Sequence, residues 1–209
     1  MLFILTGDVQ TGKTRWLMAL IEKLGNAGVT CYGVVAPGVW ESHCEGGEAR
    51  YEKLGIDNVL LPQKELVRFA LRKDIAASAS VYDGDSQSAV AQLDWAISDA
   101  AIREVNDHFL GLAAQAEEAA EAGSETPGLL VADEFGRLEL ERGQGLDEAV
   151  ALVEAGPNAL YAHALIVVRE GLYDVAYERF APAWPQMRKI YPTRESEESV
   201  LKELTCPRQ

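Results

Sequence analysis

Residues 7–14 constrain this chain more than any other segment. They read Gly7-Asp8-Val9-Gln10-Thr11-Gly12-Lys13-Thr14, which has the spacing G-x-x-x-x-G-K-[ST]. An apolar run over residues 2–6 precedes the segment, and apolar residues at helical spacing follow it over 15–21. A buried strand, a glycine-rich turn and a helix form the context in which this spacing binds phosphate. The segment therefore predicts a phosphate-binding loop between the first strand and the first helix.

The loop positions have distinct expected roles. Glycine lets backbone N–H groups turn inward around phosphate oxygens, and the positive end of the following helix points at the same anion. Lys13 is expected to reach the β- and γ-phosphates, and the hydroxyl of Thr14 to ligate Mg²⁺. The alternative is an ordinary strand-to-helix turn with a solvated lysine. The residues expected to bind a nucleotide are Gly7, Asp8, Val9, Gln10, Thr11, Gly12, Lys13, Thr14 and Arg15.

A second apolar run, residues 129–132, ends in the two acids Asp133 and Glu134. In a parallel sheet the carboxyl ends of the strands surround a loop of this kind. Asp133 is therefore expected to face the Mg²⁺ held by Thr14, and Glu134 to accept a proton from water that attacks the γ-phosphate. The alternative is a pair of solvated loop acids.

Composition limits the remaining possibilities. The chain has 209 residues, of which 48% are hydrophobic, and its net charge is −14. This size suits one α/β domain over residues 1–209, and the acidity disfavours nucleic acid as a partner. The three cysteines are far apart and have no zinc-ligand spacing. No apolar run is long enough to cross a membrane, so we expect a soluble, cytoplasmic protein without membrane insertion.

Strand-like and helix-like runs alternate along the chain, which predicts a three-layer α/β sandwich with a mainly parallel, doubly wound sheet. Residues 39–92 are expected to form an insertion, with a β-meander over 39–71 and a mobile loop over 74–92. A long helix is expected over 93–122, and residues 113–127 form its exposed extension and a surface turn. A helix over 195–204, capped by Thr193 or Ser196, is expected to end the chain.

Four segments, residues 7–14, 33–37, 59–70 and 133–140, resemble the P-loop nucleoside-triphosphatases of the family that includes the cancer-related nucleoside-triphosphatase. That family has the pattern D-E-hydrophobic-G-x-hydrophobic-E-L, which Asp133–Leu140 matches without a gap. The resemblance implies Mg²⁺-dependent hydrolysis of nucleoside triphosphates. It also implies an additional-strand ATPase sheet, in which the strand bearing Asp133 is not adjacent to the first strand. Gln10 and Thr11 stand where the family usually has a further glycine, as in a divergent, bacterial-type member.

Other residues are candidates for contacts with the nucleotide. Arg169 follows the apolar run 165–168, so it is expected at the carboxyl edge of the sheet, where an arginine can meet charge on the γ-phosphate. The alternative is a surface arginine paired with an acid, and Arg137 is the second candidate. Trp40 and Tyr191 are candidates for stacking on the base, although each can equally be a packing residue.

Together these residues favour hydrolysis of ATP or GTP to the diphosphate and phosphate, with Glu134, Lys13 and Arg169 as the catalytic residues and Mg²⁺ as the cofactor. Two alternatives stay open. In a small-molecule or nucleotide kinase, residues 39–92 would form the acceptor lid, but residues 74–92 contain no arginine. In a nucleotide-dependent accessory or switch protein, hydrolysis would be slow and a protein partner would dock on the acidic helical surface over 113–122.

Overall fold

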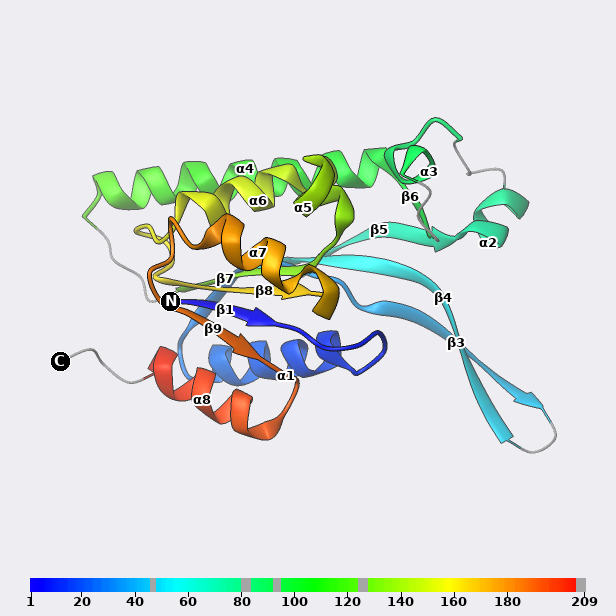
Figure 1. The fold of residues 1–209 in the computed structure, drawn as a ribbon, viewed down its shortest axis with the longest axis horizontal. Helices are drawn as coiled ribbons and strands as arrows, with labels where there is room; N and C mark the ends of the chain where they lie inside the picture. The colour runs from blue at the N-terminus through cyan, green and yellow to red at the C-terminus, as the bar shows by residue number, and fades with distance from the viewer. Residues whose placement is uncertain (46–47, 80–83, 92–94, 124–127, 206–209) are drawn as a thin grey trace.

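We analysed a computed structural model that describes residues 1–45, 48–79, 84–91, 95–123 and 128–205, apart from the side chains of Glu45, Glu48 and Glu134. The described residues form one nine-stranded sheet with helices on both faces (Figure 1). The strands are β1 (Leu2–Leu5), β2 (Thr30–Val35), β3 (Gly38–Glu45), β4 (Glu48–Leu61), β5 (Glu65–Arg72), β6 (Trp95–Ile97), β7 (Gly128–Phe135), β8 (His163–Val168) and β9 (Met187–Ile190).

Eight α-helices and one short 3₁₀ helix connect these strands within the described residues. The α-helices are α1 (Lys13–Asn26), α2 (Lys73–Ser78), α3 (Gln87–Val90), α4 (Asp99–Glu121), α5 (Arg137–Arg142), α6 (Asp147–Ala155), α7 (Tyr173–Phe180) and α8 (Arg194–Thr205). The 3₁₀ helix η1 (Glu170–Leu172) joins β8 to α7. No helix in the described ranges combines the length and the apolarity that crossing a membrane requires.

The strand order is β6-β5-β4-β2-β7-β8-β1-β9, and β3 pairs with β4 outside this path. The five strands β2, β7, β8, β1 and β9 are mutually parallel. Strand β8 separates β7 from β1, as the family resemblance implies. The strands β3 to β6 pair in antiparallel fashion. The sheet is therefore mixed, whereas the sequence predicts a mainly parallel one.

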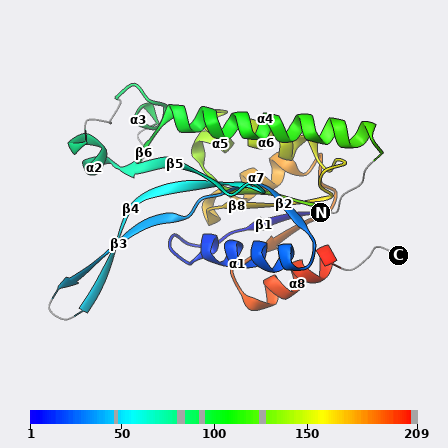
Figure 2. The same ribbon diagram turned by 180° about the vertical axis from the view of Figure 1, so that it is seen from behind.

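Strand β1 shows how the sheet divides the core into two. Its side chains alternate between the faces, as in any strand. Leu2 and Ile4 belong to the cluster formed with α4, α6 and α7, whereas Phe3 and Leu5 belong to the cluster formed with α1 and α8. The two views of the ribbon show these helix layers on opposite sides of the sheet (Figures 1 and 2). Because both faces are covered, β1 is apolar at every position.

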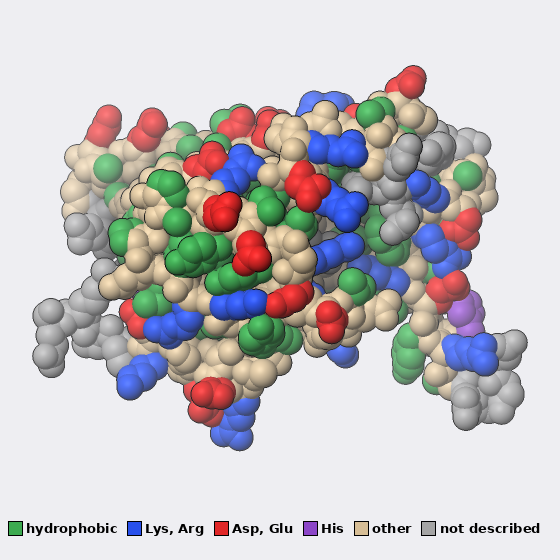
Figure 3. Space-filling view, viewed as in Figure 1, with side chains coloured by type: hydrophobic (Ala, Val, Ile, Leu, Met, Phe, Trp, Pro, Cys, Tyr) green, Lys and Arg blue, Asp and Glu red, His purple; other side chains and the backbone are tan. Residues whose placement is uncertain are grey.

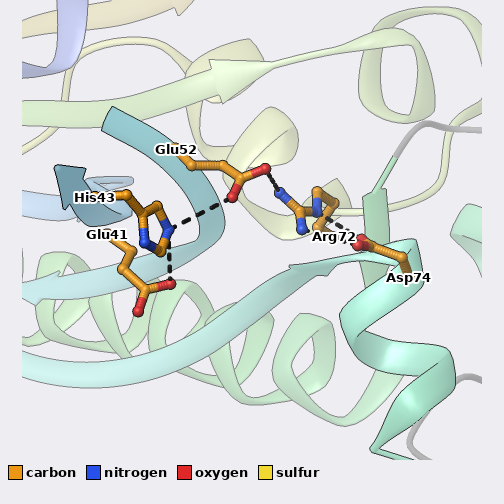
Figure 4. A network of polar contacts seen from close by, with 5 residues as sticks. All are labelled: Glu41, His43, Glu52, Arg72 and Asp74. Atoms are coloured by element: carbon orange, nitrogen blue, oxygen red, sulfur yellow. Dashed lines mark hydrogen bonds and ion pairs between the residues drawn. The ribbon is translucent and has the colours of Figure 1, made fainter. Parts of the chain in front are cut away.

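Strands β3, β4 and β5 are consecutive and antiparallel, which agrees with the meander expected over residues 39–71. β3 and most of β4 leave the body of the molecule as a two-stranded arm (Figure 2). Polar contacts link β3, β4 and β5 here: His43 Nε2 lies 3.3 Å from Glu41 Oε2 on its own strand and 3.8 Å from Glu52 Oε2 on β4, and Arg72 of β5 bonds both Glu52 and Asp74 (Figure 4). β4 alone has 14 residues, Glu48–Leu61, and most of it lies in this arm.

Two expected boundaries are wrong. The segment 74–92, expected to be a loop, includes most of α2 and all of α3, and its residues 80–83 and 92 lie outside the described structure. The long helix begins at Asp99 rather than at Leu93, because Ser98 caps it by accepting a hydrogen bond from Ala101 N at 3.3 Å. Before that cap, β6 pairs with β5 and extends the sheet.

The end of α4 is only partly exposed. Leu112 and Ala116 are buried in the larger core cluster and Ala113 packs against it, while the remaining side chains over 114–122 are mostly exposed. Residues 124–127 of the expected turn lie outside the described structure. The last helix begins close to its expected start, and Ser196 N donates to Thr193 Oγ1 at 3.2 Å, so Thr193 acts as the cap.

Candidate phosphate-binding site

The loop between β1 and α1 has an unusual backbone conformation. Gly12 has φ 84° and directly precedes the first residue of α1, and Gln10 has φ 63°. Positive φ is natural for glycine but uncommon for other residues, so Gln10 is held in a turn that its side chain does not favour. This path brings the chain sharply from the end of the strand into the helix. The first N–H groups of α1, which lack partners within the helix, therefore open toward the loop.

Lys13 closes the loop from the inside. Its ammonium group donates to the carbonyl oxygens of Gly7 at 2.8 Å and Asp8 at 2.7 Å. Thr11 Oγ1 also donates to Asp8 O at 2.9 Å. Arg15 is exposed, and its guanidinium lies beside Gly12. These contacts gather the expected phosphate-binding residues into one compact turn at the carboxyl end of β1.

Asp133 lies at the carboxyl end of β7 and is only 1% exposed. Its Oδ2 accepts a hydrogen bond from Ala36 N at 3.0 Å, which fixes the carboxylate against the residue that follows β2. The pairing of β7 with β8 shifts register between Ala132 and Phe135, so the two acids occupy an irregular position in the ladder. Such irregularities redirect side chains near functional sites. The backbone of Glu134 belongs to β7, and its side chain lies outside the described structure.

Glu139 organises the turn after the two acids. It is 6% exposed, and its two carboxylate oxygens accept from Gly136 N at 2.8 Å and from Leu146 N at 3.2 Å. Arg179 donates to its backbone carbonyl at 2.8 Å. The carboxylate of Glu139 therefore pairs with the backbone N–H groups of Gly136 and Leu146, which would otherwise lack this hydrogen-bond acceptor. The helix α5 has no clear signal in the sequence, and the structure places Glu139 in its first turn.

The two candidate arginines differ in position. Arg169 is exposed and follows β8, which lies between β7 and β1, so it stands at the carboxyl edge of the sheet with the loop and Asp133. Within the described part of the chain, its side chain makes no hydrogen bond or ion pair. Arg137 is the first residue of α5 and lies 4.0 Å from Glu141, with which it forms an exposed pair along that helix. Position therefore favours Arg169 of the two.

A cavity of about 330 Å³ adjoins the loop. It is lined by Gly7, Asp8, Thr11, Glu170, Tyr191, Pro192 and Thr193. The carboxylate of Glu170 accepts from Lys189 at 2.5 Å and from Thr6 Oγ1 at 3.1 Å. These hydrogen bonds, that of Lys189 first, hold the pKa of Glu170 below its ordinary value. Sequence reasoning missed both Thr6 and Glu170. Thr6 directly follows the buried strand β1, and Glu170 directly follows the candidate Arg169.

The two candidates for base stacking are separated in the structure. Tyr191 follows β9, lines the cavity and is 44% exposed. Trp40 lies on the β3–β4 arm, is 50% exposed and is absent from the cavity wall. Trp16 is partly buried against the core cluster formed with α1 and α8, and its indole N–H donates to Thr193 O at 2.9 Å. The structure thus brings Tyr191, but not Trp40, next to the loop.

Comparisons with known proteins give one informative likeness. No family model and no curated protein matches the chain. Among solved structures, the solution structure of a human cancer-related nucleoside triphosphatase is similar, with a TM-score of 0.56 and 16% sequence identity. The likeness covers 97% of this chain and 94% of that one. It therefore concerns nearly the whole fold, and at this identity it identifies a related α/β architecture.

Proposed function

We propose that this chain is a P-loop nucleoside-triphosphatase that hydrolyses ATP or GTP to the diphosphate and phosphate. The observation that carries the proposal is the loop over residues 7–14, which turns from the end of β1 into the N-terminus of α1 around Lys13. The buried Asp133 stands at the same edge of the sheet, beyond β8. The strand order is also the one expected of additional-strand ATPases, and the fold is similar to that of a nucleoside triphosphatase.

The local charge is compatible with a triphosphate despite the acidic composition. On the face shown in Figure 3, several Lys and Arg side chains lie close together between the body of the molecule and the β3–β4 arm. Strands β1 and β8 point toward that end of the molecule (Figure 1). Because electrostatic attraction acts over about 10 Å at ordinary salt, the local charge matters more than the net charge of −14.

The residues present fit Mg²⁺ by their chemistry. The hydroxyl of Thr14 and the carboxylate of Asp133 are hard oxygen donors, and Mg²⁺ typically binds through one or two such groups, phosphate oxygens and water. Asp133 is held in one orientation by Ala36 N, as a buried ligand should be. Nowhere in the described residues, this site included, could a group of three His, Cys, Asp or Glu side chains hold a metal ion. When bound, Mg²⁺ would neutralise charge on the β- and γ-phosphate oxygens.

Each residue then has a role in the reaction. Backbone N–H groups of the loop and the ammonium group of Lys13 bind the β- and γ-phosphates. Glu134 accepts the proton of the water whose oxygen attacks the γ-phosphorus. The bond between that phosphorus and the β–γ bridging oxygen breaks, and the diphosphate leaves with the bridging oxygen. Arg169 stabilises the charge that spreads over the transferred phosphoryl group.

The test is phosphate release from ATP and GTP with Mg²⁺ and no other substrate. Lys13→Ala and Glu134→Gln should each lower kcat by roughly 100-fold or more. The first variant removes a positive charge that stabilises the phosphates, and the second removes the general base. Glu134→Gln should still bind nucleotide, because a general base does not hold the phosphates. Exposed control variants on α1 and α8, Glu22→Gln and Lys202→Ala, should behave like the parent protein.

Three outcomes would contradict the proposal. If Lys13→Ala and Glu134→Gln release phosphate as fast as the parent, the site is misplaced. A phosphorylated acceptor in place of free phosphate would establish a kinase. Turnover that appears only with a protein partner, together with nucleotide-dependent recovery of that partner, would establish a switch protein.

A further inference from the structure

The cavity beside the loop has two walls that come from distant parts of the chain. One wall is the start of the loop, with Gly7, Asp8 and Thr11, and the other is the segment 191–193 between β9 and α8. They meet because β9 pairs in parallel with β1. The cavity is open to solvent, and its volume of about 330 Å³ is at the low end of the range of roughly 300–1,000 Å³ typical of small-molecule sites. The cavity is thus large enough to take part of a ligand held by the loop.

The second wall is fixed to the loop helix. The indole N–H of Trp16 donates to Thr193 O at 2.9 Å, and this bond ties the 191–193 segment to α1. Thr193 in turn caps α8. Both walls are therefore held by hydrogen bonds rather than by solvent-exposed side chains alone. A ligand entering the cavity would meet a surface whose shape is already set, which lowers the ordering cost of binding.

Charge decides which part of a nucleotide fits there. Two acidic residues, Asp8 and Glu170, line the cavity, and their negative charge disfavours a phosphate there. Lys189 already donates to Glu170, so its ammonium group is engaged by that carboxylate rather than by a phosphate in the cavity. The phosphates consequently belong on the N–H groups of the loop. The uncharged end of the molecule belongs in the cavity.

Tyr191 supplies the surface on which that uncharged end can lie. The ammonium group of Lys189 stands 5.7 Å from the centre of its ring and 4.2 Å from that of Tyr173. Glu170 holds Lys189 in place, so one fixed cation contacts both aromatic rings. Tyr191 remains 44% exposed and lines the cavity. A flat aromatic ring at this point is suited to stacking.

We propose that Tyr191 stacks on the nucleobase of the bound nucleotide and that Lys189 and Glu170 position it. The inference rests on the proposed function, because it places the base relative to phosphates in the loop. Stacking uses the π-face that every base has, so it discriminates weakly between bases. The site therefore accepts purine and pyrimidine nucleoside triphosphates alike.

The test compares ligands that have a base with one that lacks it. Binding of ATP, GTP, CTP, UTP and inorganic tripolyphosphate is measured by calorimetry with Mg²⁺ for the parent, Tyr191→Ala and Tyr191→Phe. Tyr191→Ala should weaken all four nucleotides by roughly tenfold, while tripolyphosphate binds as before. Tyr191→Phe should bind like the parent. Tyr51→Ala, which removes an exposed tyrosine from the β3–β4 arm, is the matched control.

The outcomes separate this inference from the proposed function. If the parent binds neither ATP nor tripolyphosphate, the proposed function fails and the inference with it. If the parent binds both and Tyr191→Ala binds ATP unchanged, only the stacking role is wrong. Equal weakening of ATP and tripolyphosphate would assign Tyr191 to the support of the loop. A loss confined to one nucleotide would overturn the base-tolerant site.

Discussion

The two halves of the sheet are stabilised in different ways. In the parallel half, β1 and β8 are buried at every position, because helices cover both faces. In the antiparallel half, β5 is buried at only two of its eight positions and no residue of β6 is fully buried. Burial of apolar surface dominates the first half, whereas backbone pairing and exposed polar contacts dominate the second.

This difference accounts for the position of the site. The buried strands of the parallel half end at one edge, so the loop, Asp133 and Arg169 are brought together by a rigid core. In the β3–β4 arm, opposite faces of the ribbon carry pairs such as Ser42 with Tyr51 and Glu41 with Glu52, and these side chains are exposed. A site that requires fixed side chains is therefore built in the parallel half.

The largest difference should appear when a methyl group is added to a glycine in each half. At Gly33 on β2, with φ 109°, a Cβ would lie 2.0 Å from the carbonyl oxygen of Val131 on the paired strand β7. Gly33→Ala should therefore cost about 4 kcal/mol in unfolding free energy through backbone strain and displacement. At Gly38 on β3, the nearest atoms are the ends of the Trp40 and Lys53 side chains. Gly38→Ala should cost less than about 1 kcal/mol, because these ends can move.

Urea unfolding of the two variants measures this contrast. Equal costs would mean that the arm is packed as rigidly as the β2–β7 pair. A cost near zero for Gly33→Ala would mean that β2 and β7 can separate without loss, contrary to their burial between two helix layers.

Replacing the buried carboxylate of Glu139 should lower the free energy of unfolding by less than Gly33→Ala does. Glu139→Gln keeps one acceptor oxygen and replaces the other with an NH₂ group, so either Gly136 N or Leu146 N loses its partner. An unpaired buried donor costs about 1–3 kcal/mol. Unfolding in urea should show this loss. An exposed acid of α4, replaced as Glu118→Gln, is the control and should unfold like the parent. A neutral result for Glu139→Gln would indicate that water replaces the missing acceptor.

The same contrast explains which features could be predicted from the sequence. The first helix lies directly after the loop, as the sequence predicts, because an apolar strand, a glycine-rich turn and a helical stripe are all local signals. The bounds of the arm strands could not be predicted, since their mostly exposed residues give no apolar alternation. The start of α4 was misplaced because Ser98 was not recognised as its cap.

The candidate site also has a part that the sequence predicts and a part that it does not. The loop is contiguous, so its residues could be named from the motif. The cavity wall could not be assembled from the sequence, because Glu170, Tyr191 and Thr193 reach the loop only through the pairing of β8 and β9 with β1. Tyr191 was a candidate on residue type alone, and its neighbourhood required the fold.

The smallest effect is expected at the exposed ion pairs of the antiparallel half. Arg72 bonds Asp74 and Glu52, and its hydrogen bonds to Asp74 hold the pKa of that carboxyl below its ordinary value (Figure 4). A carboxyl group whose pKa is lower in the folded state stabilises the fold above its unfolded pKa, and this contribution is lost as pH falls through the folded pKa. Arg72→Ala should therefore lower the urea midpoint at pH 7 by less than Glu139→Gln does.

The difference in urea midpoint between Arg72→Ala and the parent should also become smaller in acid, because protonation removes the charge of Asp74. It should become smaller in high salt as well, because ions screen the attraction between Arg72 and the carboxylates. Arg194→Ala on α8 removes a single exposed partner, Glu198, and serves as the control with a still smaller change. A difference in urea midpoint that stays constant as pH falls and salt rises would show that Arg72 stabilises the fold by packing of its side chain rather than by charge. The base of the arm would then resemble the buried half more closely than its exposed side chains indicate.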